Sequence, residues 1–184
     1  MKRSLLLLIA TLGLASTAHA EFNYTFIQGN IGNVDFDNVN ADGTIFGVDG
    51  SLAINDDFHV FGGADLANLS RGVDATSWAG GIGYNTSLNE VVDIVAQLSF
   101  RYVDFDFRGG SSDDSGIGLS VFARWAATDR VEINGGLDHD EAGDNTSLIG
   151  AALYNIDEQF TVGVSGSFDD DVTVLNLVGR MYFY

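Results

Sequence analysis

The chain contains no cysteine and no proline, and it is poor in basic residues. The lack of cysteine excludes a disulfide-stapled scaffold and a zinc or iron–sulfur site held by thiolates. Proline interrupts β-ladders, so its absence from all 184 residues suits a chain that is hydrogen-bonded strand almost throughout. Eight basic residues stand against 26 acidic ones, and the formal net charge is −18. This charge excludes a protein that grips nucleic acid through a basic surface.

The first twenty residues have the layout of a secretory signal peptide. Lys2 and Arg3 precede an apolar run over residues 5–14, and residues 18–20 (Ala-His-Ala) place small side chains where a signal peptidase reads them. The apolar run is shorter than the roughly 20 residues of a transmembrane helix. We therefore predict a cleaved signal peptide at residues 1–20, with cleavage before Glu21. The exported chain then has six basic residues, all of them arginine.

Beyond the signal peptide, apolar residues alternate with polar or small ones, a period of two that is typical of β-strands. Ile117, Leu119 and Val121, for example, alternate with Gly118 and Ser120. Such runs recur to the end of the chain, with no linker and no second domain between them. We expect strands at residues 22–35, 43–55, 57–69, 75–86, 90–106, 115–126, 130–140, 146–155, 159–169 and 172–184.

The connections between these runs alternate in character. One set of connections consists of short turns, near residues 55–57, 87–89, 128–129 and 156–158. Longer or more acidic loops alternate with them, at residues 37–43, 69–75, 106–115, 140–145 and 169–171. Short turns on one rim, longer loops on the other and an even strand count are what an outer-membrane barrel requires. We predict an all-β fold: an antiparallel transmembrane β-barrel over residues 21–184, with ten strands or, alternatively, eight. Both termini are expected in the periplasm and the acidic loops outside.

The end of the chain resembles the terminal signal by which outer-membrane barrels are sorted, with Gly179 followed by Tyr182 and Tyr184. This feature is similar to that of the small outer-membrane β-barrel families of Gram-negative bacteria. About a third of the chain also resembles uncharacterised, porin-like barrels of proteobacteria. The matching stretches are residues 24–29 (YTFIQG), 41–43 (ADG) and 55–63 (NDDFHVFGG). The resemblance implies an integral outer-membrane protein.

Strand parity places a set of charged residues inside the expected barrel: Arg101, Arg124, Arg180, Asp49, Asp65, Asp93, Glu132 and Asp138. A hairpin centred on Thr128 sets Arg124 directly across from Glu132 as an ion pair. Arg180 is assigned to the interior because an arginine on the lipid face costs about 2–4 kcal/mol at mid-membrane. Two interpretations stay open. The charges form a cation-selecting constriction, or they form a paired structural network that fills a narrow lumen.

Other polar and aromatic groups admit simpler interpretations. The acidic loops are expected to be solvated, with weak Ca²⁺ binding as the alternative; we predict no metal site and no cofactor. His59 and His139 lie near no placed nucleophile, so no catalytic residues and no enzymatic activity are expected. Nine aromatics near strand ends are predicted to form interfacial girdles. They are Tyr24, Trp78, Tyr84, Phe100, Tyr102, Trp125, Tyr154, Tyr182 and Tyr184.

Two classes of function therefore remain: a narrow, cation-preferring pore, or a closed barrel that presents acidic loops for adhesion or envelope integrity. The expected partners are outer-membrane lipid, lipopolysaccharide and the barrel-assembly machinery. Nucleic acid is excluded, and the sequence leaves the oligomeric state open.

Overall fold

The computed structural model describes residues 22–36, 41–141 and 144–184; the predicted signal peptide lies outside them. Within these residues the chain forms ten antiparallel strands and one short 3₁₀ turn, η2, at Ser70–Gly72. The ten-strand prediction is confirmed. The strands are β1 (Phe26–Phe36), β2 (Ala41–Ala53), β3 (Phe58–Leu69), β4 (Val73–Asn89), β5 (Val92–Phe107), β6 (Gly110–Thr128), β7 (Val131–Asp140), β8 (Asn145–Asn155), β9 (Phe160–Phe168) and β10 (Val172–Tyr182).

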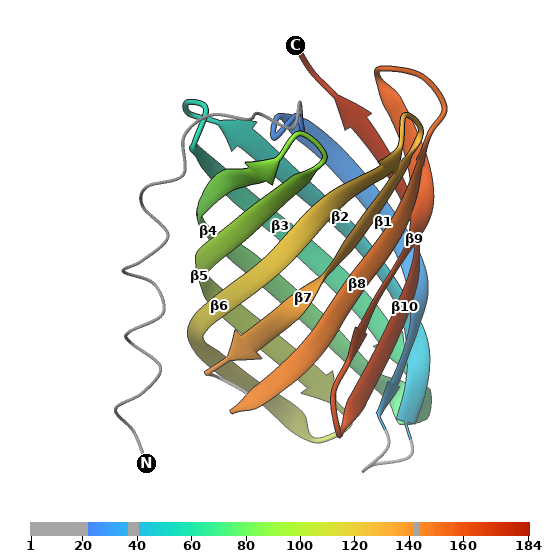
Figure 1. Ribbon diagram of the computed structural model, residues 1–184. Helices are drawn as coiled ribbons and strands as arrows, with labels where there is room; N and C mark the ends of the chain where they lie inside the picture. Colours follow the sequence, from blue (N-terminus) through green and yellow to red (C-terminus); the bar gives the residue numbers. More distant parts are fainter. Residues whose placement is uncertain (1–21, 37–40, 142–143) are drawn as a thin grey trace.

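The sheet closes on itself into a barrel (Figure 1). Each strand pairs with its neighbours in sequence, and β1 pairs with β10 from Phe26 opposite Tyr182 to Phe36 opposite Val172. Within the closed wall of the barrel every strand is paired on both sides, which removes the need for the lysines that protect open sheets. No helix among the described residues is long and apolar enough to cross a membrane.

The barrel has two rims. The terminal rim carries the turns at residues 54–57, 90–91, 129–130 and 156–159 together with residues 22–25 and the C-terminus, at the top of Figure 1. The far rim carries residues 70–72, 108–109 and 169–171 and the described parts of two further connections. Residues 37–40 and 142–143, which belong to two of the predicted acidic loops, lie outside the described residues.

The predicted acidic loop at residues 106–115 is wrong, because most of it is strand. Asp106 lies on β5, and Asp113 and Asp114 lie on β6, joined by a turn at Arg108 and Gly109. β6 begins at Gly110 but pairs with β7 only from Gly118 onward, so the β5–β6 hairpin extends past its neighbour at the far rim. Beyond the apolar band both faces of a strand meet water, and polar residues on both faces hide the period that marks a strand.

The outer wall of the barrel is apolar all the way round. Each strand contributes a large aliphatic or aromatic side chain that is between 45% and 64% exposed: Ile31, Phe46, Leu66, Ile82, Leu98, Val121, Leu137, Leu148, Val164 and Leu177. A continuous belt of this kind is stable only against the hydrocarbon of a bilayer. Leu175, Leu177 and Phe183 face outward while Arg180 faces the lumen, the register that the cost of a lipid-facing arginine predicts.

Asp169 organises the β9–β10 turn at the far rim. Its carboxylate accepts hydrogen bonds from the backbone N–H groups of Asp171 (2.8 Å) and Val172 (2.6 Å), and from the side chains of Asn145 and Ser147 on β8 (3.1 Å each). Partial burial raises the pKa of Asp169, but these four hydrogen bonds outweigh burial and hold the pKa below its usual value.

Asp169→Ala is expected to destabilise the barrel by about 1–2 kcal/mol at neutral pH, because the turn loses all four of these bonds. A carboxyl with a lowered pKa stabilises the fold above its ordinary pKa of about 3.9, and the contribution disappears as the pH falls through the folded value. Urea unfolding in micelles should therefore separate variant from wild type at pH 7 and bring them together in strong acid. Asp170→Ala, in the same turn and exposed, is the control; an equal loss there would contradict the assignment.

Candidate functional site in the barrel lumen

Near the terminal rim, inward side chains fill the lumen in a single layer. We call this the closing layer; its members are between 1% and 9% exposed and are Tyr24, His59, Asp93, Arg124 and Glu132. They come from the segment before β1 and from β3, β5, β6 and β7. Barrel closure brings them to one level, where they are largely shielded from solvent.

The centre of the closing layer is a bidentate ion pair. Arg124 donates from Nε and Nη2 to the two carboxylate oxygens of Glu132, at 3.0 and 2.9 Å. The guanidinium also lies 4.6 Å from the ring centres of both Phe22 and Tyr24, close enough for cation–π attraction. A buried pair of this geometry depends on both partners, since either charge alone is very costly to bury.

The pair is diagonal rather than directly cross-strand, which corrects the predicted register. Arg124 lies opposite Asn134, and Glu132 lies opposite Ala126. The ladder is irregular between Ala126 and Thr128, which moves the turn from Thr128 to residues 129–130. The irregularity lies between the turn and both charged residues, so Arg124 and Glu132 keep the inner face of their strands. The two charges therefore still meet, through the reach of the arginine.

The other half of the layer is a hydrogen-bond network around His59 and Asp93. Tyr24 stacks on the His59 ring at 4.9 Å and donates its hydroxyl proton to Asp93 at 2.9 Å. The His59 Nδ1 atom lies 3.2 Å from the amide oxygen of Asn85, and its Nε2 atom lies 3.1 Å from the amide nitrogen of Gln97. Nδ1 therefore carries the proton and Nε2 accepts, so the imidazole is neutral. Both ring nitrogens are occupied, which leaves His59 no free base for catalysis.

Arg180 lies beside the closing layer on β10. Its guanidinium donates to the Gln28 side-chain oxygen at 2.9 and 2.7 Å and to the Tyr182 hydroxyl at 3.0 Å. It is 4.0 Å from Glu132. Glu132 thus interacts with two arginines: with Arg124 at 2.9 Å and with Arg180 at 4.0 Å, the limit of an ion pair.

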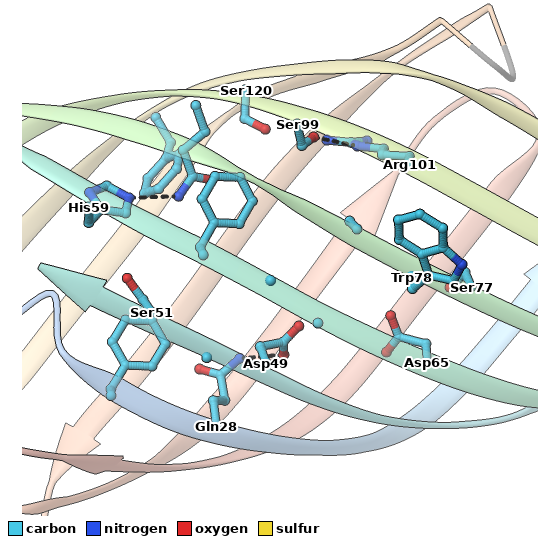
Figure 2. A pocket seen from close by; sticks show the side chains of 18 of the residues that line it. Gln28, Asp49, Ser51, His59, Asp65, Ser77, Trp78, Ser99, Arg101 and Ser120 are labelled. Atoms are coloured by element: carbon cyan, nitrogen blue, oxygen red, sulfur yellow. Dashed lines mark hydrogen bonds between the residues drawn. The ribbon is translucent and has the colours of Figure 1, made fainter. Parts of the chain in front are cut away.

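A cavity of about 490 Å³ occupies the lumen on the far side of the closing layer (Figure 2). It extends from Tyr24 and Arg124 to Asp114 and Asp140 near the far rim, so it opens in that direction. Aromatic rings and polar groups line it together. Figure 2 places Asp49 and Asp65 on one part of the wall and Arg101 on another.

Arg101 is neutralised in place. It donates from Nη1 and Nη2 to the two carboxylate oxygens of Asp138, both at 2.6 Å, and lies 3.5 Å from Asp140. Ser120 donates a further hydrogen bond to Asp138. The guanidinium is therefore held by two carboxylates, and this part of the wall is not an anion site.

Asp49 and Asp65 lie on the opposite, acidic wall. Asp49 accepts hydrogen bonds from the side-chain amides of Gln28 (3.3 Å) and Asn30 (3.2 Å). None of the ion pairs found among the described residues involves Asp49 or Asp65. The amide oxygen of Asn30 is buried and has no hydrogen-bond partner in the described structure. This wall thus holds two carboxylates that take part in none of the ion pairs found among the described residues.

A second cavity, of about 770 Å³, opens at the terminal rim. The turns of that rim, including Glu90, Arg130 and Glu158, line it together with Tyr182. In the described part of the chain, Arg124 is the residue that both cavities share. One layer of side chains therefore separates the two halves of the lumen.

The structure places all eight sequence-predicted lumen residues on the inner face. Five of them form ion pairs: Arg101 with Asp138, and Glu132 with Arg124 and Arg180. The other three are Asp49, Asp65 and Asp93. Sequence reasoning missed the neutral partners of these charges. The polar ones that make hydrogen bonds in the lumen are Gln28, Asn30, Asn85, Gln97 and Ser120.

The prediction of an interfacial girdle is wrong for two of the nine aromatic residues. Tyr24 and Tyr182 are 9% and 6% exposed and face the lumen, where they contact Arg124 and Arg180. The parity of Tyr182 with Arg180 was a usable signal, because residues two apart on a strand share a face. Phe100, Trp125 and Tyr154 do face outward, between 44% and 48% exposed, whereas Trp78 is 46% exposed and also borders the lumen cavity (Figure 2). Gly179, Tyr182 and Tyr184 remain predicted parts of a sorting signal.

His139 lies on the outer face of β7. Its Nδ1 atom is 2.8 Å from the backbone oxygen of Asn145 and 3.0 Å from the hydroxyl of Thr146. The carbonyl can only accept, so Nδ1 carries the proton and is not a base for the threonine. Within the described ranges, no group of three or more histidines and carboxylates is placed to hold a metal ion.

No family model matches the chain, and no curated protein matches it by sequence. Among solved structures, it is similar to the KdgM porin (12% identity, TM-score 0.50, 85% of this chain and 99% of that one). It is also similar to the translocator domain of the autotransporter NalP from Neisseria meningitidis (8% identity, TM-score 0.51, 90% of each chain). At such identities the likeness shows the fold.

The fold, the apolar belt and the polar lumen together define the class. The chain is a closed ten-stranded β-barrel of the outer-membrane type, similar in fold to the KdgM porin, and its apolar belt places it in the outer membrane.

Proposed function

We propose that the protein is a narrow, cation-preferring pore, closed at the closing layer in this conformation, with the terminal rim in the periplasm. The observation that carries the proposal is the pair of cavities that enter from opposite rims and share Arg124. A lumen that is open from both sides and interrupted by one layer needs only a small displacement to become continuous.

The charges of the lumen support a preference for cations. Beyond the closing layer, the inner wall carries five carboxylates and one guanidinium: Asp49, Asp65, Asp114, Asp138, Asp140 and Arg101. Within and beside the layer, two arginines balance two carboxylates: Arg124 and Arg180 with Asp93 and Glu132. A net negative charge along the entrance to a channel, within a wall of low dielectric constant, concentrates cations and repels anions.

Single-channel recording of the refolded chain without its predicted signal peptide tests the proposal. We expect discrete conductance steps in a planar bilayer, and a reversal potential under a KCl gradient that reports cation preference. Slower migration of the unheated sample on a gel establishes that the barrel is folded. A folded barrel that gives no conductance steps, or one that prefers chloride, would overturn the proposal.

A second candidate function is a closed barrel that presents the β5–β6 hairpin to lipopolysaccharide or another surface. The burial of the closing layer favours it, since Asp93 and Arg124 are only 2% and 3% exposed and both are fully paired. Replacing residues 105–112 by Asn-Gly joins Asp104 to its cross-strand neighbour Asp113 and preserves the register. Lost binding to lipopolysaccharide vesicles by this folded variant would support the surface role; unchanged binding would contradict it.

A further inference from the structure

We propose that the cavity beyond the closing layer is a binding site for small organic ammonium ions, amines whose protonated nitrogen is attached to an apolar or aromatic body. The inference uses the same acidic wall as the proposed pore, but it does not require that the lumen conduct. It depends on the size of the cavity, on the charge of its walls and on the position of its aromatic rings.

The size of the cavity favours an organic ligand over a bare metal ion. About 490 Å³ lies within the range of roughly 300–1,000 Å³ that is usual for sites of small organic molecules. A hydrated metal ion would leave most of this space to water. In the part of the chain that the structure describes, no three carboxylates or histidines converge as metal ligands, whereas Ca²⁺ takes six or more oxygen ligands.

The acidic wall matches the donors of an ammonium group. A primary ammonium has three N–H donors and no acceptor. Asp49 and Asp65 both line the cavity and present carboxylate acceptors from neighbouring strands. The hydrogen bonds found for Asp49 come from neutral amides, and none of the ion pairs found among the described residues involves either carboxylate. A cation at this wall neutralises the carboxylates.

Two glycines hold the carboxylates against the wall. Gly47 lies directly across from Asp65, and Gly63 lies directly across from Asp49. A side chain at Gly47 would collide with the Asp65 carboxylate and with Asn30, and one at Gly63 would collide with Asp49. Each carboxylate therefore rests over the glycine of the other strand. The centre of the lumen is left open for a ligand, although the barrel has only ten strands.

The remaining walls define the rest of the ligand. Phe61 and Phe122 line the same cavity and offer an apolar surface to the body of the amine. Arg101 is engaged by Asp138 and Asp140, so it does not attract anions into the cavity. At the base, Arg124 and Arg180 repel a cation that has entered. An ammonium ion is thus attracted by the side wall and stopped at the closing layer.

Calorimetric titration of the refolded barrel in uncharged detergent micelles tests this site. The probes share one ring and differ in charge: benzylamine hydrochloride, benzyl alcohol and sodium benzoate at pH 7, each corrected for heat with empty micelles. We expect binding of the amine and no binding of the alcohol or the benzoate. Comparable binding of the alcohol, or no heat with the amine, would overturn the proposal.

The variant Asp49→Asn/Asp65→Asn keeps the shape of both side chains and removes both charges; it is expected to weaken amine binding at least tenfold. The control, Asp74→Asn/Asp106→Asn, removes the same charge from a cross-strand pair on the outer face and should bind as wild type does. An equal loss in the control would mean that net charge, not the cavity, attracts the amine. If the double variant does not fold, each single variant at Asp49 or Asp65 should still weaken binding severalfold, and unchanged binding in both would overturn the proposal.

The two proposals fail in different ways. Amine binding by a barrel that never conducts removes the pore and leaves the ammonium site. Conductance without amine binding removes the ammonium site and leaves the pore.

Discussion

Removal of Arg124 and Glu132 together is expected to join the two cavities and raise the conductance of the barrel severalfold. Arg124 is the described residue that lines both cavities, and Glu132 is the group that holds it across the lumen. The variant Arg124→Ala/Glu132→Ala deletes both charges, so neither is left buried and unpaired. Planar-bilayer recording measures the step size, and swelling of liposomes in sugars of increasing size measures the width of the opened path.

A matched control removes one charge of each sign outside the layer. Arg130 and Glu158 lie on turns of the terminal rim, are exposed and line only the rim cavity. Arg130→Ala/Glu158→Ala should leave the conductance step near its wild-type size. A closing-layer variant that is folded yet conducts no better than wild type would show that Tyr24 and Tyr182 alone suffice to seal the lumen, and it would contradict the assigned role of the ion pair.

Glu132→Lys is expected to lower the free energy of unfolding by about 3–5 kcal/mol, the usual cost of breaking a buried ion pair from one side. The substitution leaves Arg124 buried without its carboxylate and adds a third cation within reach of Arg180. The remaining carboxylate of the layer, Asp93, is already engaged by Tyr24 and Ser87. Denaturant unfolding in micelles, followed by gel migration and tryptophan fluorescence, measures the loss.

Two further variants separate charge from hydrogen bonding at this position. Glu132→Gln keeps one acceptor oxygen for Arg124, so its loss of stability should be smaller than that of Glu132→Lys. The alanine double variant should be more stable than Glu132→Ala alone, because removing Arg124 relieves the unpaired charge. If all these variants unfold at the same denaturant concentration as wild type, the closing layer contributes nothing to stability and the pair is incidental.

Strand parity was enough to assign the inner and outer faces, because a side-chain period of two does not depend on the partner strand. Arg124 and Asp138 could be placed inside by counting from apolar neighbours. The beginning of β6 could not be found in this way, since residues 110–116 (GSSDDSG) carry no apolar side chain on either face. The diagonal contact between Arg124 and Glu132 was also out of reach, because it depends on a bulge that parity does not see.

The sequence by itself determined the export signal as a prediction, the count of ten strands, the apolar outer wall and the charged residues of the lumen. Only the tertiary structure decided their depth along the barrel axis and their partners. Tyr24 meets Asp93, and Arg180 meets Gln28, across 69 and 152 residues. Both contacts depend on the stagger of the strands and on the closure of β1 against β10. Hydrogen-bonded closure is a property of the whole sheet, so no single strand encodes which side chains share a level of the lumen.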